Sequence, residues 1–158
     1  MRNIEYKEID DETEEKIIAK WGNWVRDWGE IHRGEGCYSL AAICNSEPVG
    51  FISAYPLYYP APLEKYCDAY IGYVGVDKEH RRQGIATKLI DMTEQWAKEY
   101  GYRQIRGWDE DEKIEALSMW YKRGYAMCPA IMRGVCPDEK ARDKIFYGFY
   151  VAKVLNPN

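Results

Sequence analysis

The most informative stretch of the sequence is residues 73–87, which read YVGVDKEHRRQGIAT. An apolar strand ends at Val76, a polar turn follows, and a helix begins after Gly84, where apolar residues return at helical spacing. The stripe consists of Ile85, Leu89, Met92 and Trp96. The first turn of a helix has unpaired N–H groups and the positive end of the helix dipole. A strand, a turn and a helix in this order therefore predict an anion-binding site.

The composition of this turn suits a diphosphate. Arg81, Arg82 and Lys88 supply positive charge, and Gly84 lets a ligand approach the backbone without meeting a Cβ. The stretch matches neither the GxxxxGK[ST] phosphate loop nor the GxGxxG dinucleotide fingerprint. The sequence therefore predicts a diphosphate site of a different kind.

The segments around this stretch predict an α+β domain with the order β-α-α-β-β-β-α-β-α-β-β. Periodicity and turn residues give the following ranges: strands at 3–9, 37–44, 49–55, 69–76 and 103–108, two short helices within 11–28, a long hairpin loop at 56–67, helices at 83–101 and 114–123, and two strand-like segments within 125–155 around a polar turn at 137–144. The alternating second half implies parallel pairing, and the early hairpins imply antiparallel pairing.

Two motifs resemble the GNAT superfamily of acyl-CoA-dependent N-acetyltransferases. Arg81-x-x-Gly84-x-Ala86 fits that family's [RQ]-x-x-G-x-[GA] pyrophosphate loop, and residues 116–125 (AxxxWYxxGY) look like its A-x-x-x-Y-x-x-x-G-F segment. The resemblance covers the chain by element order. It implies a single acetyltransferase domain over residues 1–158, with a mixed, mostly antiparallel central sheet of about seven strands. About four helices would cover both faces, and two strands would splay apart at the CoA site.

The resemblance also implies how acetyl-CoA is held as the co-substrate. Backbone N–H groups of residues 82–87 would cradle the pyrophosphate, and the pantetheine would lie along residues 74–76. A backbone N–H near Val76 would act as the oxyanion donor. The implied cofactor-binding residues are Val74, Val76, Arg81, Arg82, Gln83, Gly84, Ile85, Ala86 and Thr87.

The sequence departs from the family at both usual acid–base positions. The family often has Glu on the strand before the loop and Tyr on the second-block helix, and these positions fall here on Tyr70 and Trp120. Removing a proton from an alkylammonium, whose pKa is about 10.4, still requires a base. The candidate catalytic residues are Asp68 or Asp109 as the end of a water-relayed base, and Tyr121 as the acid.

Each candidate has a plainer interpretation. Asp68 fits a solvated carboxylate at the start of a strand, Asp109 fits a cap of the following helix, and Tyr121 fits core packing or a structural hydrogen bond. A histidine side chain can act as a base near neutral pH, so His32 and His80 are further candidates, although we interpret both as surface residues.

Aromatic residues make up 15% of the chain, enough to supply rings to a ligand pocket as well as to the core. In this family the first helices and the hairpin loop hold the acceptor, and here those segments carry Trp and Tyr beside acidic residues. Rings beside carboxylates suit a small-molecule amine. The predicted substrate-binding residues are Trp24, Trp28, Tyr58 and Tyr70, with Asp27, Glu30 and Glu35 nearby. Trp21, Val25 and Trp28 share a helical face with Ile17 and Ile18, so part of these rings also fits the core.

Charge and composition limit the class of protein. The net charge of −4 and the isoelectric point near 5.3 argue against a nucleic-acid binder. The N-terminus has no apolar signal-peptide region and no run approaches a membrane span, so we expect a cytoplasmic protein without membrane partners. Five cysteines without CxxC spacing and only two histidines indicate reduced, mostly buried thiols and no metal site. The apolar segment 145–151 suggests a final strand at the edge of a homodimer, or else a covered internal strand.

These observations leave three functional hypotheses. The first is transfer of an acetyl group from acetyl-CoA to a primary amine of a small molecule by direct attack. The second is acetylation of a protein N-terminus or lysine. The third is a CoA-binding regulatory module without catalysis, because Tyr70 and Trp120 stand where the family's base and acid are expected.

Overall fold

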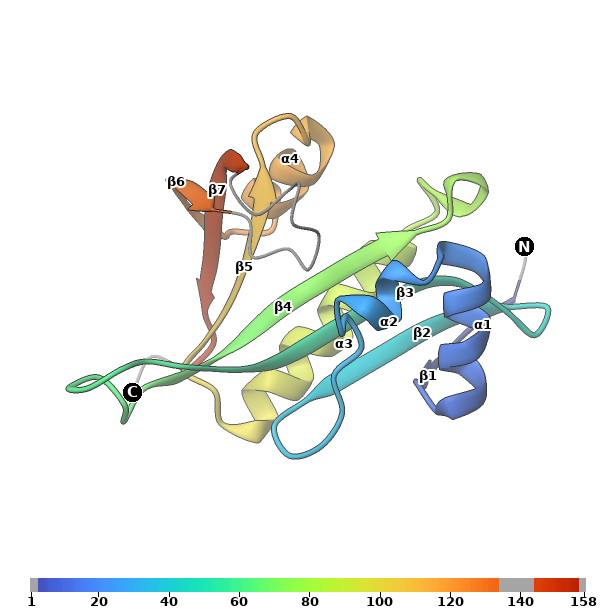
Figure 1. Cartoon of the computed structure of the whole chain (residues 1–158), viewed down its shortest axis with the longest axis horizontal. Helices are drawn as coiled ribbons and strands as arrows, with labels where there is room; N and C mark the ends of the chain where they lie inside the picture. The colour runs from blue at the N-terminus through green and yellow to red at the C-terminus, as the bar shows by residue number, and fades with distance from the viewer. Residues whose placement is uncertain (1–2, 134–143, 157–158) are drawn as a thin grey trace.

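The computed structural model describes residues 3–133 and 144–156 (Figure 1). The elements follow the predicted order, with one 3₁₀ turn, η1, added before the long helix. They are β1 (Ile4–Glu8), α1 (Asp11–Trp21), α2 (Trp24–Asp27), β2 (Tyr38–Cys44), β3 (Glu47–Tyr58), β4 (Cys67–Val76), η1 (Lys78–His80), α3 (Ile85–Tyr100), β5 (Gln104–Glu110), α4 (Ile114–Lys122), β6 (Ala126–Arg133) and β7 (Ile145–Val154).

One seven-stranded sheet with the order β1-β2-β3-β4-β5-β7-β6 runs through the molecule. All neighbouring pairs are antiparallel except β4 and β5, which are parallel. The expectation of a mixed, mostly antiparallel sheet with helices on both faces is confirmed. Helices α1 and α2 cover one face in Figure 1, and α3 lies behind the other.

Helix boundaries follow from local chemistry. The Asp10 side chain caps α1 by accepting the Thr13 N–H at 2.8 Å, and α3 ends at Gly101 in the left-handed conformation. The predicted stripe of α3 faces the sheet, with Ile85 and Leu89 fully buried. These contacts fix α3 against the sheet, so the loop at its N-terminus has a rigid support.

Strands β4 and β5 separate after a short stretch of pairing. Both lie wholly within the described residues, yet they pair only at Ala69 with Ile105 and at Tyr70 with Arg106. Beyond these pairs the two halves of the sheet diverge, as Figure 1 shows. The edge of β4 from residue 71 to residue 76 is therefore left without a strand partner on this side. This is the predicted splay.

A β-bulge in β4 lies at the beginning of this free edge. Ser53 pairs with Tyr73 and Ala54 pairs with Ile71, so Gly72 has no partner on β3. A bulge turns the local strand direction and re-aims the side chains beside it. Here it separates the buried, fully paired start of β4 from the open part.

Three expectations were wrong in detail. Strands β3 and β4 extend into the predicted hairpin loop, so the connection spans only residues 59–66. Strand β7 lies between β5 and β6 rather than at an edge, which removes the argument for a dimer through β7. Among the described cysteines only Cys44 is buried, and Cys128 is exposed. Cys136 and most of the predicted turn at 137–144 lie outside the described residues.

Candidate functional site

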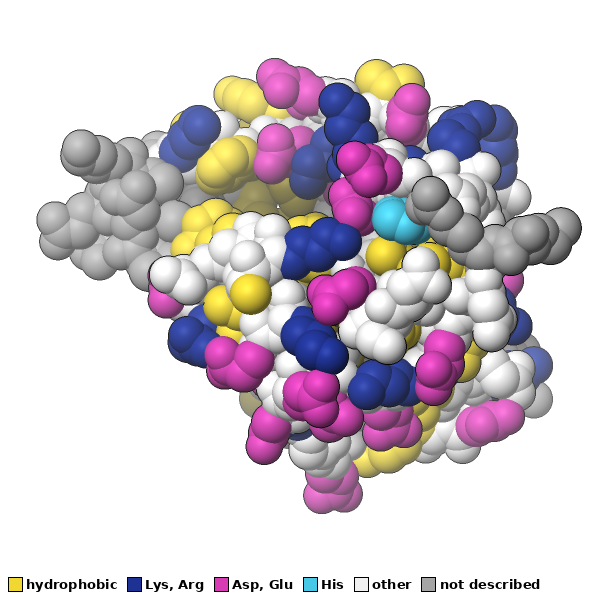
Figure 2. All heavy atoms as spheres, turned by 90° about the vertical axis from the view of Figure 1, so that its right-hand side faces the viewer, with side chains coloured by type: hydrophobic (Ala, Val, Ile, Leu, Met, Phe, Trp, Pro, Cys, Tyr) yellow, Lys and Arg dark blue, Asp and Glu magenta, His cyan; other side chains and the backbone are white. Residues whose placement is uncertain are grey.

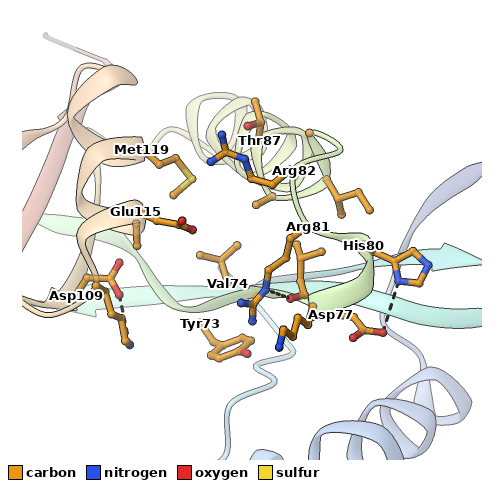
Figure 3. A pocket seen from close by; sticks show the side chains of 18 of the residues that line it. Tyr73, Val74, Asp77, His80, Arg81, Arg82, Thr87, Asp109, Glu115 and Met119 are labelled. Carbon is orange, nitrogen blue, oxygen red and sulfur yellow. Dashed lines mark hydrogen bonds and ion pairs between the residues drawn. The ribbon is translucent and has the colours of Figure 1, made fainter.

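A groove of about 1020 Å³ opens where β4 and β5 separate. Its floor is the free part of β4, one wall is the loop before α3, and the opposite wall is the start of α4 with the end of β5. Figure 2 shows the molecule hollowed on this side, with hydrophobic side chains inside the hollow and charged side chains around it. Figure 3 shows Arg82 and Thr87 on the helix side and Glu115 and Met119 across from them.

The loop before α3 has the backbone shape of an anion site. Arg82 and Gly84 both have positive φ, at 62° and 79°. The first intrahelical bond runs from the Lys88 N–H to the Gly84 carbonyl at 2.9 Å, so the N–H groups of the preceding turn have no partner within the helix. A Cβ at Gly84 would meet no described atom within 4 Å, so this face of the loop is open to a ligand.

The Arg81 side chain folds back over the end of β4. Its Nε donates a hydrogen bond to the Val76 carbonyl at 3.0 Å, as Figure 3 shows. Asp77, just after the strand, pairs with Lys20 of α1 at 2.7 Å. The Lys20 cation holds the pKa of Asp77 below its usual range. These contacts tie the turn to both β4 and α1 and hold the loop in position.

The opposite wall carries a hydrogen bond between β5 and α4. Trp120 is 2% exposed, and its Nε1 donates to the Asp109 carboxylate at 2.6 Å. Lys113 approaches the other oxygen of Asp109 at 3.6 Å. Asp109 therefore lines the groove with both carboxylate oxygens already in contact with donors. It does not cap α4, because Lys113 occupies that position.

The comparisons with known proteins agree with this geometry. A sequence model described as the acetyltransferase (GNAT) family matches residues 2–125. The chain belongs to the acetyltransferase (GNAT) family. The predicted resemblance and the expected type of enzyme are confirmed at the level of the family.

Individual GNAT relatives are distant. An uncharacterized N-acetyltransferase of Methanocaldococcus jannaschii is 29% identical over 106 residues, which are 67% of this chain and 46% of that protein. The chain thus spans less than half the length of this curated relative. Arabidopsis thaliana NAA60 in complex with a bisubstrate analogue superposes with a TM-score of 0.74 at 17% identity, covering 99% of this chain and 100% of that one. Aminoglycoside 6'-acetyltransferase type Ii gives a TM-score of 0.67 at 20% identity, covering 98% and 99%.

The structure brings nearly all of the predicted cofactor-binding residues of this GNAT chain to one groove. Residues Val74, Val76, Arg81, Arg82, Gly84, Ile85, Ala86 and Thr87 line it. Gln83 is not among the lining residues, and its side-chain amide reaches the Glu79 carbonyl at 3.5 Å. The free N–H groups, the open glycine and the unpaired β4 edge all fit the pyrophosphate and pantetheine of a CoA thioester.

The structure does not bring the three predicted catalytic residues together. Asp109 lines the groove, but Asp68 and Tyr121 are not among its lining residues. The interpretation of Asp68 as a solvated carboxylate is wrong, because it is 0% exposed. Its Oδ2 accepts hydrogen bonds from the hydroxyl of Tyr59 and from Gln104 Nε2, the latter at 2.6 Å. Asp68 therefore joins the hairpin end to β5.

Replacing Tyr121 by phenylalanine is expected to leave both kcat and the affinity for acetyl-CoA unchanged. The Tyr121 side chain is 73% exposed on α4, away from the groove, and the core-packing interpretation fails for the same reason. Steady-state rates and calorimetric titration of the Tyr121→Phe variant would measure this. A tenfold fall in kcat would show that Tyr121 reaches the reaction after all.

The predicted acceptor-binding residues also differ in position. Trp24 packs on Tyr73 at 5.3 Å between ring centroids, and Trp28 packs on Trp24 while remaining 54% exposed. Tyr70 packs against Tyr55 at 5.4 Å, and burial raises the pKa of the Tyr70 hydroxyl. Tyr58 is 69% exposed and lines a separate depression near the end of α3, so the structure does not bring it to the others.

Tyr73 was missed in the sequence, and the two histidines were set aside. Tyr73 lines the groove, and its hydroxyl lies over Gly75, where it occupies the space that a Cβ would need. Alternation along β4 could have placed Tyr73 on the same face as Gly75. Neither histidine lies on the surface as expected: His80 lines the groove and is 9% exposed, and His32 is half-buried and packs on Tyr55 beside the β4 bulge. No local signal marks His32, because its contacts come from β3 and β4.

Over the described parts of the chain, 3–133 and 144–156, no helix is long and apolar enough to cross a membrane. Within the same residues there is no cluster of three or more His, Cys, Asp or Glu arranged to hold a metal ion.

Proposed function

We propose that this protein is an N-acetyltransferase that moves the acetyl group of acetyl-CoA to a primary amine of a small molecule by direct attack. The single observation that carries the proposal is the free edge of β4 leading into the loop at residues 81–87. The edge offers backbone groups to the pantetheine amides, and the loop offers N–H groups to the pyrophosphate. Both elements line one groove.

The chemistry beside the groove supports an amine as the acceptor. Burial raises the pKa of the Tyr55 and Tyr73 phenols, and the negative charge of Glu30 nearby raises both further. Rings and a carboxylate together attract an ammonium group through cation–π and charge interactions. Burial raises the pKa of the Glu30 carboxyl itself, and an ammonium group bound beside it would oppose that shift by stabilising the ionised form.

A protein N-terminus or lysine is the second candidate acceptor. The exposure of Trp28 and Tyr58 favours it, since exposed rings along an open surface could contact a peptide. Turnover of a panel of small primary amines, compared with a panel of peptides that present free N-termini or lysines, separates the two candidates. A higher kcat/KM for the peptides would overturn the small-molecule assignment.

Saturating acetyl-CoA is expected to raise the melting temperature. A ligand at one hundred times its Kd adds about 2.7 kcal/mol to stability, which corresponds to about 5 °C or more for a domain of this size. Differential scanning fluorimetry of protein freed from co-purified CoA measures the shift. Adenosine, which lacks the pyrophosphate and the pantetheine, is the control ligand. An unchanged melting temperature would contradict the cofactor assignment. Binding of acetyl-CoA without release of CoA thiol with any acceptor would instead favour the non-catalytic module.

A further inference from the structure

The imidazole of His32 lies over the bulge of β4. His32 belongs to the connection between α2 and β2, and its ring stacks on Tyr55 with 4.1 Å between centroids. A Cβ at Gly72 would come within 3.9 Å of the His32 Cε1 and within 2.9 Å of the Tyr55 ring. Gly72 is the bulge residue, and the free edge of β4 continues from it into the groove. The ring therefore lies beside the residue that precedes Tyr73, the first residue of β4 that lines the groove, although His32 itself is not among the lining residues.

The hydrogen bonds of Ser39 and Ser53 with His32 determine which ring nitrogen carries the proton of the neutral imidazole. Ser39 Oγ is 2.7 Å from the His32 carbonyl, which can only accept, so Ser39 uses its single hydroxyl proton there. Ser53 Oγ is 2.8 Å from Ser39 Oγ, and its own proton must therefore go to Ser39. Ser53 has then no proton left, and at 3.2 Å from His32 Nδ1 it must accept the proton of that nitrogen.

This assignment of the two serine protons leaves one tautomer of the neutral His32 ring. Nδ1 carries the proton, and Nε2 carries the lone pair. Ser53 also accepts the His32 backbone N–H at 3.0 Å, which fills its second acceptor position. Because Ser53 is fully buried and Ser39 is 6% exposed, water does not compete for these bonds. The loop therefore presents a basic nitrogen in a fixed direction.

The surroundings keep this ring neutral at physiological pH. Burial lowers the pKa of His32 below its usual value near 6.5, and the Glu30 backbone carbonyl opposes that shift. The groups facing the ring are Ser53 and Tyr55 of β3, Gly72 of β4, and Glu30 of its own connection. The Tyr55 phenol is neutral, since burial and the Glu30 charge both raise its pKa.

We propose that His32 Nε2 is the general base that accepts the proton of the acceptor ammonium, an inference that rests on the proposed acetyltransferase function. The freed amine attacks the thioester carbon, a C–N bond forms, the C–S bond breaks, and CoA leaves as the thiolate. The nitrogen loses two protons in total, of which one ends on the CoA sulfur and one reaches solvent by way of His32. This assigns the role that the family pattern leaves open at Tyr70.

The test compares His32→Asn with the wild type on the amine and peptide panels. The Asn amide can still donate to Ser53 but offers no basic nitrogen, so it preserves a structural role and removes a catalytic one. We expect kcat/KM to fall at least about 100-fold, with the Kd of acetyl-CoA within twofold. In the wild type, kcat/KM falls as the pH drops through the His32 pKa below 6.5, and this acidic limb disappears in His32→Asn.

Two further variants sharpen the comparison. Ser53→Ala removes the acceptor that fixes the tautomer, so kcat/KM should fall less than in His32→Asn, and ¹⁵N spectra should show a mixture of tautomers instead of the Nδ1–H form alone. Arg33→Ala is the matched control from the same connection. Its guanidinium pairs with Asp11 and Glu14 of α1, and its loss should leave kcat/KM within twofold.

The outcomes separate the two proposals. An active wild type with an unaffected His32→Asn variant, or a wild-type ring that carries its proton on Nε2 at pH 7.5, overturns the role of His32 and leaves the acetyltransferase proposal standing. A wild type that acetylates no acceptor overturns the proposed function and the inference together. A loss of rate in Arg33→Ala equal to that in His32→Asn would show that the connection acts only through its fold.

Discussion

Replacing Gly84 by glutamate is expected to abolish the binding of acetyl-CoA while the protein stays folded. The new carboxylate would stand in the open space beside the free N–H groups of the first turn of α3, where the pyrophosphate is expected. It would repel the phosphates and occupy their place. Isothermal titration with acetyl-CoA measures the loss, and circular dichroism reports the fold.

The other end of the same helix provides a matched control. Gly101 is also left-handed, with φ at 100°, and a Cβ there meets no described atom within 4 Å. Gly101→Glu therefore carries a similar backbone cost of about 1 kcal/mol without placing charge in the groove. It should bind acetyl-CoA as the wild type does. If Gly84→Glu kept its affinity, or if Gly101→Glu lost it equally, the loop would not be the diphosphate site.

Replacing Asp68 by alanine is expected to lower the free energy of unfolding by about 3 kcal/mol. The carboxylate is fully buried and lies 3.7 Å from Arg103 and 3.9 Å from Arg106. Arg106 also donates to the Tyr59 hydroxyl, which in turn donates to Asp68. Alanine would remove the only carboxylate of this described network and leave Arg106, which is 20% exposed, with its charge poorly compensated. Chemical denaturation measures the change.

One asparagine variant separates the charge of Asp68 from its hydrogen bonds, and a second, at Asp91, is the control. Asp68→Asn can keep the hydrogen bonds from Tyr59 and Gln104 and removes only the charge, so its loss should be smaller than that of Asp68→Ala. Asp91→Asn removes a half-exposed carboxylate that pairs with Arg123, and it should change stability by less than about 0.5 kcal/mol. A catalytic Asp68 would give a different result. The Asp68→Asn variant would then lose its rate while keeping nearly all of its stability.

The features that the sequence predicted well are those with local causes. The strand before residue 77, the glycine at 84 and the apolar stripe of α3 follow one another directly in the chain, and each has its own pattern. Gly101 marked the end of α3 for the same reason. The cofactor groove followed from these elements because strand, loop and helix N-terminus are consecutive in the chain.

The features that the sequence left open depend on distant segments. Asp68 is buried because Tyr59, Gln104 and Arg106 surround it, and no pattern near residue 68 indicates that. The apolar pattern of β7 fits an edge and an interior strand equally well, and the pairing with both β5 and β6 decides between them. His32 acquires its orientation from Ser53, which is 21 residues away.

The separation of β4 from β5 has a consequence for how the protein behaves among its neighbours in a crowded solution. Unpaired strand edges promote aggregation, because the strand of another chain can add to them. Here the unpaired edge lies inside the sheet, between two diverging halves, and not at its rim. A flexible, narrow ligand can enter this gap, whereas a second folded chain would have to push α4 and the α3 loop aside. The recess thus keeps free backbone donors available to a ligand and protects the protein from self-association through them.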